Sequence, residues 1–194
     1  MILSAHTKSI LVLSSMLAFF AARSMTAQQN HAVSIGANYT YVRTNLVSGC
    51  NCFGLNGGGA EVQFGLSPRL ALLGDLTVTH RGDITSNHYD LTQFSYAGGI
   101  RYFPASFGRL RPFGNLLVGG AHTSGSLSPS ETGRGGANAF LFETGGGVAI
   151  SFGHRWTLVP VRASYLLTTF SNGYDNHQND LRISAGLQWR LSKR

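Results

Sequence analysis

The chain has little charge, few cysteines and no second long apolar run. Asp, Glu, Lys and Arg make up 12% of its 194 residues, which is roughly half the share found in soluble domains. Two cysteines without a paired histidine spacing supply too few ligands for a zinc site. Beyond the N-terminal region, no apolar run approaches the roughly 20 residues that a membrane-spanning helix needs. The composition therefore argues against both an ordinary soluble domain and a helical membrane protein.

The N-terminal residues predict export from the cytoplasm. Lys8 precedes an apolar run over residues 10–22, and small residues follow at Ser24, Thr26 and Ala27. This is the pattern of a secretory signal peptide. We expect residues 1–27 to be that signal peptide and residues 28–194 to form one domain. The net charge of +7 does not then indicate nucleic acid, because export separates the chain from such partners.

The last stretch of the chain alternates between apolar residues and polar or small ones. Over residues 181–191 the apolar positions are Leu181, Ile183, Ala185, Leu187, Trp189 and Leu191. Successive side chains of a strand point to opposite sides, so one face is apolar and the other carries two arginines and a glutamine. A tilted strand of this length can cross a hydrocarbon layer. We interpret it as the closing strand of a membrane barrel.

The same alternation predicts seven further strands, at residues 32–41, 60–66, 70–80, 91–103, 113–122, 139–151 and 156–168. The connections after odd strands are long and polar, at residues 43–58, 81–90, 123–137 and 169–180, whereas those at 67–69 and 152–155 are short. Adjacent Leu116 and Leu117 leave the facing of the fifth strand undecided. Three glycines at 145–147 predict a bend or a close backbone approach, and Pro160 predicts a strand end or bulge.

These features predict an all-β fold, an eight-stranded antiparallel up-and-down transmembrane β-barrel. Its long loops would lie outside the cell, and its short turns and both ends in the periplasm. A soluble barrel with an apolar interior is the alternative. The glycine- and serine-rich polar face, the alternating connection lengths and the closing strand favour the membrane barrel.

Two C-terminal segments, GGGVAISFGHRWTLVPVRASYLLTTF and NDLRISAGLQWRL, resemble the small outer-membrane β-barrel proteins abundant in Acidobacteria. More broadly, the chain resembles the OmpA-like and OmpX-like eight-stranded barrels. Ser184, Gly186, Trp189 and Leu191 resemble the C-terminal signal that such barrels present to the barrel assembly machinery, with Leu191 where an aromatic residue is common. The resemblance implies an outer membrane of the Gram-negative type, with its lipids and lipopolysaccharide as surroundings. We expect a monomer, and the loop partner is unknown.

Charged residues on the polar face would meet inside the barrel. These candidates for luminal ion pairs are Glu61, Asp75, Arg101, Glu143, Arg162, Arg182 and Arg190. Because an isolated buried charge costs several kcal/mol, such groups must pair or stay hydrated. We interpret them as a plug of ion pairs, since eight strands leave room only for side chains. The alternative is a narrow ion or small-solute pore gated by exchange of partners.

Cys50 and Cys52 lie in the first long connection, with one residue between them. Outside the cytoplasm thiols tend to be oxidised, so we expect a small disulfide within the loop rather than a metal site. Basic residues gather in the predicted periplasmic connections, where they either contact lipid phosphates or keep the turns solvated. They are Arg69, Arg109, Arg111, Arg155, Lys193 and Arg194.

His122, Thr123 and Ser124 resemble the His-x-Ser arrangement of an outer-membrane lipid A deacylase family. In such a site Ser124 would attack an ester, His122 would take its proton, and Glu131 or Glu143 would orient the histidine. A single His-x-Ser also fits a strand that enters a loop. We therefore predict no catalytic residues, cofactor or metal, and a structural or surface-interaction role through the long loops. A lipid A-modifying hydrolase at His122 and Ser124 remains the alternative.

Overall fold

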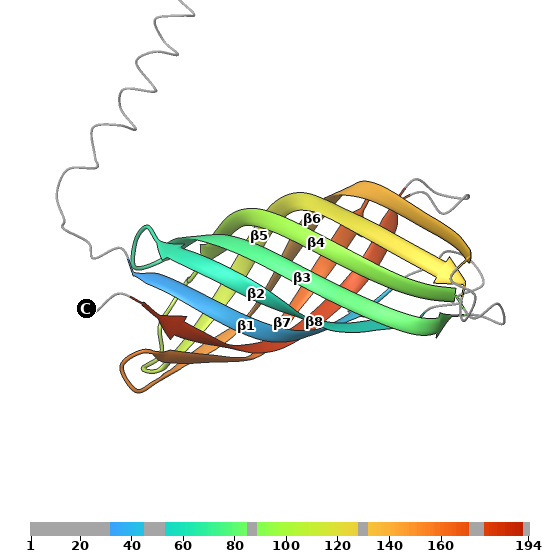
Figure 1. Cartoon of the computed structure of the whole chain (residues 1–194). Helices are drawn as coiled ribbons and strands as arrows, with labels where there is room; N and C mark the ends of the chain where they lie inside the picture. The colour runs from blue at the N-terminus through green and yellow to red at the C-terminus, as the bar shows by residue number, and fades with distance from the viewer. Residues whose placement is uncertain (1–31, 45–52, 85–88, 128–131, 171–176, 192–194) are drawn as a thin grey trace, which may run out of the picture. The chain divides into compact units, whose positions relative to one another are not determined.

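The computed structural model describes residues 32–44, 53–84, 89–127, 132–170 and 177–191. Each strand is hydrogen-bonded to the next, and β1 also pairs with β8, so the sheet closes into a barrel (Figure 1). The strands are β1 Val33–Arg43, β2 Gly54–Gly65, β3 Leu70–Ile84, β4 Tyr89–Tyr102, β5 Leu110–Leu127, β6 Thr132–Phe152, β7 Trp156–Thr168 and β8 Gln178–Arg190. The predicted eight-stranded antiparallel barrel is confirmed. No helix in these ranges has the length and apolar character to span a membrane.

The two faces of the barrel wall differ in polarity, because alternate side chains point to opposite sides. On β3, Asp75 and Thr77 are buried inside, whereas Leu72 and Leu76 are 45% and 51% exposed on the outer surface. The closing strand repeats this pattern, with Arg182 and Ser184 inside and Leu181 and Ile183 outside. Polar groups therefore line the middle of the barrel, and large apolar side chains cover its exterior.

The barrel has a turn end and a loop end. The turn end holds the start of β1, the end of β8 and the connections 66–69, 103–109 and 153–155. The first of these connections is short, as predicted, and the hydroxyl oxygen of Ser67 accepts hydrogen bonds from two backbone N–H groups, at 3.2 and 3.0 Å. Gly108 and Gly153 in the other two have φ of 64°, which favours glycine.

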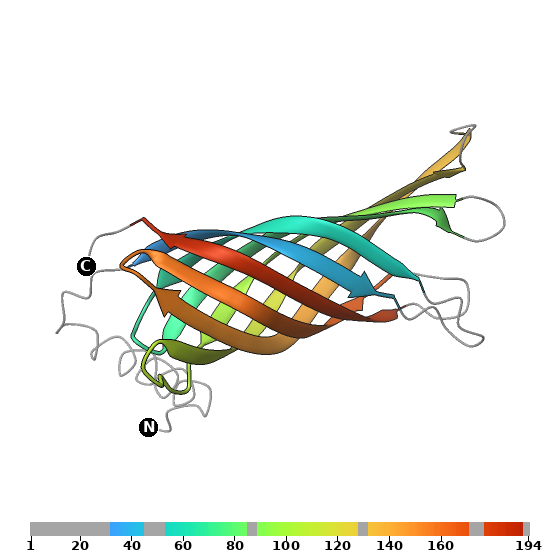
Figure 2. The ribbon, with the colours of Figure 1, turned by 90° about the horizontal axis from the view of Figure 1, so that it is seen from below.

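The strands at the loop end are longer than the alternation predicted. β2 begins at Gly54, and β5 and β6 extend into the predicted connection 123–137, leaving only residues 128–131 between them. The connection 85–88 is also shorter than 103–109 at the turn end, so the predicted strict alternation of connection lengths is wrong. Backbone pairing continues there through glycines, which have no side chain to alternate. Figure 2 shows the β3–β4 and β5–β6 hairpins projecting at this end.

The structure shows which way the side chains point at two places where the sequence left this open or where the alternation is interrupted. On β5, Leu117 is fully buried in the lumen and Leu116 is 46% exposed outside, which settles the undecided strand. On β7, the pairing register shifts between Val159 and Arg162, so Pro160 lies at a bulge as predicted. Because of this bulge, Val159 faces the lumen, whereas an unbroken alternation from the inward Arg162 would place it outside.

Candidate functional site

Six charged side chains from six strands converge in the middle of the lumen, and we call them the charged layer. The layer consists of the carboxylates of Glu61 (β2), Asp75 (β3) and Glu143 (β6) and the guanidinium groups of Arg101 (β4), Arg162 (β7) and Arg182 (β8). All six side chains are at most 8% exposed. Three negative and three positive formal charges cancel, so the layer is neutral as a unit.

Asp75 lies at the centre of one half of the layer. Its carboxylate accepts hydrogen bonds from Arg182 Nη2 at 2.9 Å and from Arg162 Nη2 at 3.0 Å. Arg182 Nη1 donates to Glu143 at 2.8 Å, and its other terminal nitrogen also contacts the hydroxyl of Thr77. Glu143 is completely buried and lies 3.9 Å from Arg162. Arg162 and Arg182 therefore both join Asp75 on β3 to Glu143 on β6.

Glu61 organises the other half of the layer. Both of its oxygens accept hydrogen bonds from Arg101, at 3.2 and 3.1 Å, and Oε2 also accepts one from Arg162 at 3.2 Å. Arg162 thus links the two halves into one network. The network is completed by amide side chains at Gln63, Asn115 and Gln188.

The charged layer leaves almost no open space. The cavity beside Glu61, Arg101 and Arg162 has a volume of about 10 Å³, which is room for roughly one water molecule. Eight strands leave an interior that side chains can fill, and here charged side chains fill it. The charged side chains of this layer therefore contact one another across the lumen.

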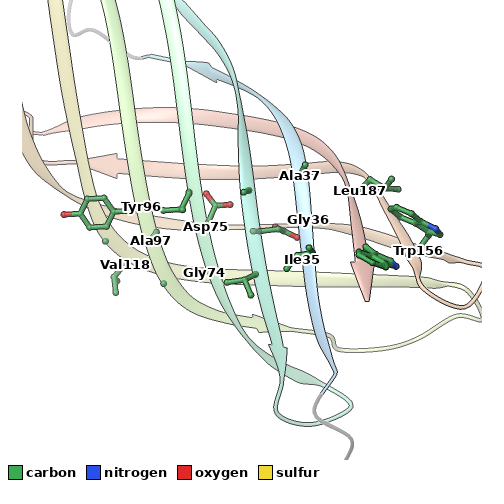
Figure 3. A pocket seen from close by; sticks show the side chains of 17 residues that line it. Ile35, Gly36, Ala37, Gly74, Asp75, Tyr96, Ala97, Val118, Trp156 and Leu187 are labelled. Atoms are coloured by element: carbon green, nitrogen blue, oxygen red, sulfur yellow. The ribbon is translucent and has the colours of Figure 1, made fainter. Parts of the chain in front are cut away.

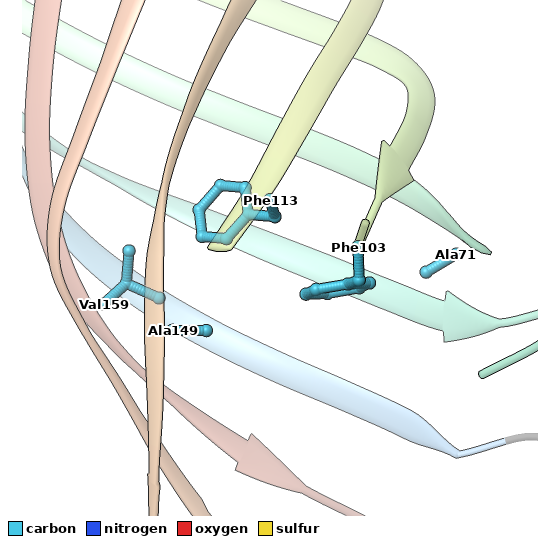
Figure 4. Close-up of a cluster of buried hydrophobic side chains, with 5 residues drawn as sticks. All are labelled: Ala71, Phe103, Phe113, Ala149 and Val159. Carbon is cyan, nitrogen blue, oxygen red and sulfur yellow. The ribbon is translucent and has the colours of Figure 1, made fainter. Parts of the chain in front are cut away.

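An apolar layer closes the lumen on the turn-end side of the charged layer. It consists of Ala71, Phe103, Phe113, Ala149 and Val159 (Figure 4). The two phenylalanine rings meet edge to face, with centroids 6.0 Å apart. The Arg101 guanidinium lies 4.4 Å from the centroid of Phe113, and that of Arg111 lies 4.0 Å from Phe103. This layer therefore separates the charged layer from the basic residues of the turn end.

A second apolar cluster lies toward the loop end. Ala121, Leu141, Leu166 and Phe170 pack together inside the barrel, and none is more than 7% exposed. The charged layer thus has an apolar layer on its turn-end side and, on its loop-end side, an apolar cluster beside buried polar side chains such as Ser95, Thr168 and Asp180. A polar solute would meet an apolar layer on the turn-end side of the charges.

Sequence reasoning identified the six charged members but not their amide partners. Gln63, Asn115 and Gln188 share the inward face with the charged residues. Their positions in the alternation of inward and outward residues could therefore have identified them. Arg190, the seventh candidate, lies apart from the network and lines a pocket at the turn end. Cys50 and Cys52 lie outside the described residues.

The candidate catalytic residues face away from the lumen. His122 and Ser124 are exposed on the outer side of β5, and His122 Nδ1 lies 2.8 Å from Oδ1 of Asn138. Glu143 is buried inside the barrel, so it cannot orient His122. Glu131 lies outside the described residues. In the described part of the chain, no three His, Cys, Asp or Glu side chains are placed to hold a metal ion.

The outer surface carries an apolar hollow of about 940 Å³ that crosses several strands (Figure 3). Its floor is made by small outward residues, Ala37, Ala60, Gly74 and Gly98, which pair across β1–β4. Tyr96 and Val118 lie at one end, and Trp156 and Leu187 lie at the other. The indole rings of Trp156 and Trp189 stack with centroids 6.1 Å apart. Such a surface suits hydrocarbon rather than a polar ligand.

The outer membrane protein beta-barrel domain family model matches residues 12–190. The chain belongs to this family. It is therefore an outer-membrane β-barrel, and the alternative of a soluble barrel is wrong, since its large apolar side chains face outward. The exterior lies in the lipid and lipopolysaccharide environment of that membrane. Comparison with curated proteins gives no significant sequence match.

Solved structures share the fold at low sequence identity. The attachment invasion locus protein Ail of Yersinia pestis is 16% identical, with a TM-score of 0.58, and the alignment covers 83% of this chain and 99% of Ail. Neisserial surface protein A is 12% identical, with a TM-score of 0.62 and coverage of 82% and 97%. The outer membrane protein OprG of Pseudomonas aeruginosa is 10% identical, with a TM-score of 0.54 and coverage of 83% and 96%. These similarities concern the fold alone.

Proposed function

We propose that this barrel has a structural or surface-interaction role, in which its loop end makes the contacts. The observation that carries the proposal is the filled lumen, in which a neutral charged layer lies beside an apolar layer on its turn-end side. A solute crossing the barrel would have to disrupt both layers. A partner would therefore bind to a surface outside the lumen. The projecting β3–β4 and β5–β6 hairpins enlarge the surface at the loop end (Figure 2).

The alternative of a narrow pore predicts measurable current, so planar-bilayer conductance is the test. We expect negligible current for the wild-type protein and for Glu61→Gln and Arg182→Gln. Each substitution removes one charge from the layer but leaves the apolar layer intact. Stable channels in the wild type, changed in size or ion selectivity by either substitution, would instead assign the barrel a pore function.

The orientation and export of the chain form a second part of the proposal. The turn end faces the periplasm and the loop end faces the exterior, as is usual for these barrels, and residues 1–27 are removed as a signal peptide. The intact mass of the protein purified from outer membranes should equal that of residues 28–194. A mass that includes residues 1–27 would contradict this maturation.

Assembly is proposed to depend on the closing strand. Trp189 and Leu191 are 38% and 45% exposed on the outer surface, whereas Ser184 is buried and faces the lumen. The exposure of these two side chains supports a contact between this strand and the barrel assembly machinery. We also propose a monomer. We expect Trp189→Ala to lose the heat-modifiable form, seen by electrophoresis of boiled and unboiled samples. We expect the wild-type protein in detergent to have the mass of a monomer.

A further inference from the structure

A small cavity borders the charged layer near the seam where β1 pairs with β8 and closes the barrel. Its volume of about 10 Å³ is room for roughly one water molecule. Asn38 of β1 and Gly186 of β8 pair with each other across the seam, and both line the cavity. The other lining residues with polar side chains are Glu61, Arg101, Arg162, Ser184 and Gln188. A cavity of this size that is surrounded by polar groups suits water, whereas an apolar cavity stays dry.

Two features of the wall place the cavity at this point. A Cβ added at Gly186 would lie 2.5 Å from the carbonyl oxygen of Ala37 and 2.7 Å from Cβ of Asn38, so a larger residue does not fit there. Glycine therefore leaves the inward side of β8 without side-chain atoms beside Asn38. On the other side of β8, Val159 pairs with Gly186, and the register shifts before Arg162. This bulge interrupts the regular ladder next to the same cavity.

Two buried nitrogen atoms of residues that line the cavity have no hydrogen-bond partner among the described residues. They are Nδ2 of Asn38 and Nε of Arg162. The hydroxyl of Thr40 donates to Oδ1 of Asn38 at 2.7 Å, which identifies the other amide atom as the donor nitrogen. The terminal nitrogens of Arg162 donate to Glu61 and Asp75, at 3.2 and 3.0 Å. Because buried polar groups are nearly always hydrogen-bonded, two such donors beside one cavity indicate an occupant that accepts from both.

We propose that one resident water molecule occupies this cavity and accepts hydrogen bonds from Asn38 Nδ2 and Arg162 Nε. The volume admits a single heavy atom, and an occupant that accepts from two N–H groups is not a cation. An anion would lie beside the Glu61 carboxylate and upset the neutrality of the charged layer. Water meets these conditions, because it also has two hydrogens to donate. Such a water joins β1 to β7 across β8 and ties the closing seam of the barrel to the charged layer.

The test is NMR spectroscopy of the isotope-labelled barrel in detergent micelles, which detects contacts between water and side-chain protons. The protons observed are the Nε–H of Arg162 and the amide hydrogens of Asn38. In rotating-frame spectra the sign of a cross-peak separates a bound water from proton exchange with the solvent. We expect a bound-water cross-peak at both groups in the wild-type protein. Absence of this cross-peak at either group would overturn the proposal.

Asn38→Leu removes one donor and fills the cavity with apolar atoms, so the cross-peak at Arg162 should disappear. The matched control is Gln93→Leu, which replaces a buried, inward amide of β4 that does not line the cavity. Both cross-peaks should persist in this control. If Asn38→Leu lacks the heat-modifiable form, Val159→Leu enlarges another lining side chain and should likewise remove the cross-peak at Arg162. An unchanged cross-peak in a folded variant of either kind, or its loss in the control, would contradict a water at this position.

Discussion

The charged layer and the turn-end apolar layer are neighbours in one lumen, yet they close it by different means. The charged layer depends on directional contacts between six strands, whereas the apolar layer depends on packing of a few side chains. Arg101 belongs to both, because it donates to Glu61 and also lies against Phe113. A directional network specifies which strands meet, while an apolar layer keeps water and ions out. The two layers should therefore respond differently to substitution.

The largest effect is expected for Asp75→Ala, which removes the acid shared by Arg162 and Arg182. Two buried guanidinium groups then lose a partner, and breaking a buried pair in this way costs about 3–5 kcal/mol; we expect a value near the top of that range. The free energy of unfolding can be measured by urea titration in lipid vesicles, followed by tryptophan fluorescence.

The control for this prediction is Thr79→Val, at another buried, inward position of β3. It preserves side-chain shape and removes no charge, so its cost should be about 1 kcal/mol. Similar losses at Asp75 and Thr79 would mean that the charged layer contributes no more than ordinary polar packing. The contrast between the two luminal layers would then disappear.

The second prediction concerns the apolar layer. Phe113→Ala removes a buried ring and its contacts with Phe103 and Arg101, and large-to-small core changes of this kind cost about 3–5 kcal/mol. We expect the lower end, near 3 kcal/mol, because water from the turn-end pocket that Arg111 and Arg190 line can enter the space. Unfolding in lipid vesicles again gives the value.

Phe140→Ala is the matched comparison, since Phe140 is 53% exposed on the outer surface. Lipid chains can fill the space that its ring leaves, so its cost should be clearly smaller. If the two phenylalanine variants lose equal stability, the interior packing around Phe113 is not the source of the effect. The substitution would then reveal only the general cost of losing an aromatic side chain.

The sequence predicted the facing of side chains best where the lumen is polar. On β3 and β8, inward polar residues alternate with outward apolar ones, so a period of two identifies both faces. Val159 could not be placed in this way, because it enters the apolar layer, where inward and outward residues look alike. Leu117 could not be placed because its neighbour Leu116 is the same residue type. The length of β2 was missed for a related reason, since its first half is rich in glycine.

The candidate site was predicted in its members but not in its pairing. Parity identified Glu61, Arg101 and Arg162 as inward residues. Which acid each arginine contacts depends on the register between strands and on their tilt around the barrel, and these are set by the whole closed sheet. Arg190 shows the consequence: it has the right parity but lies too near the turn end to join the charged layer.

The smallest predicted effect concerns glycines of the barrel wall, where the backbones of neighbouring strands approach closely. A Cβ added at Gly145 would lie 2.3 Å from the carbonyl oxygen of Ala163, whereas one added at Gly98 would have no neighbour closer than 4.0 Å. Gly145→Ala should therefore cost about 1–2 kcal/mol through overpacking, and Gly98→Ala should be nearly neutral. Unfolding titrations of the two variants under identical lipid conditions make the comparison. Gly145 lies two residues after Glu143 on β6. If Gly145→Ala leaves the free energy of unfolding unchanged, this strand can shift without disturbing Glu143. The charged layer would then tolerate more movement than its contacts imply.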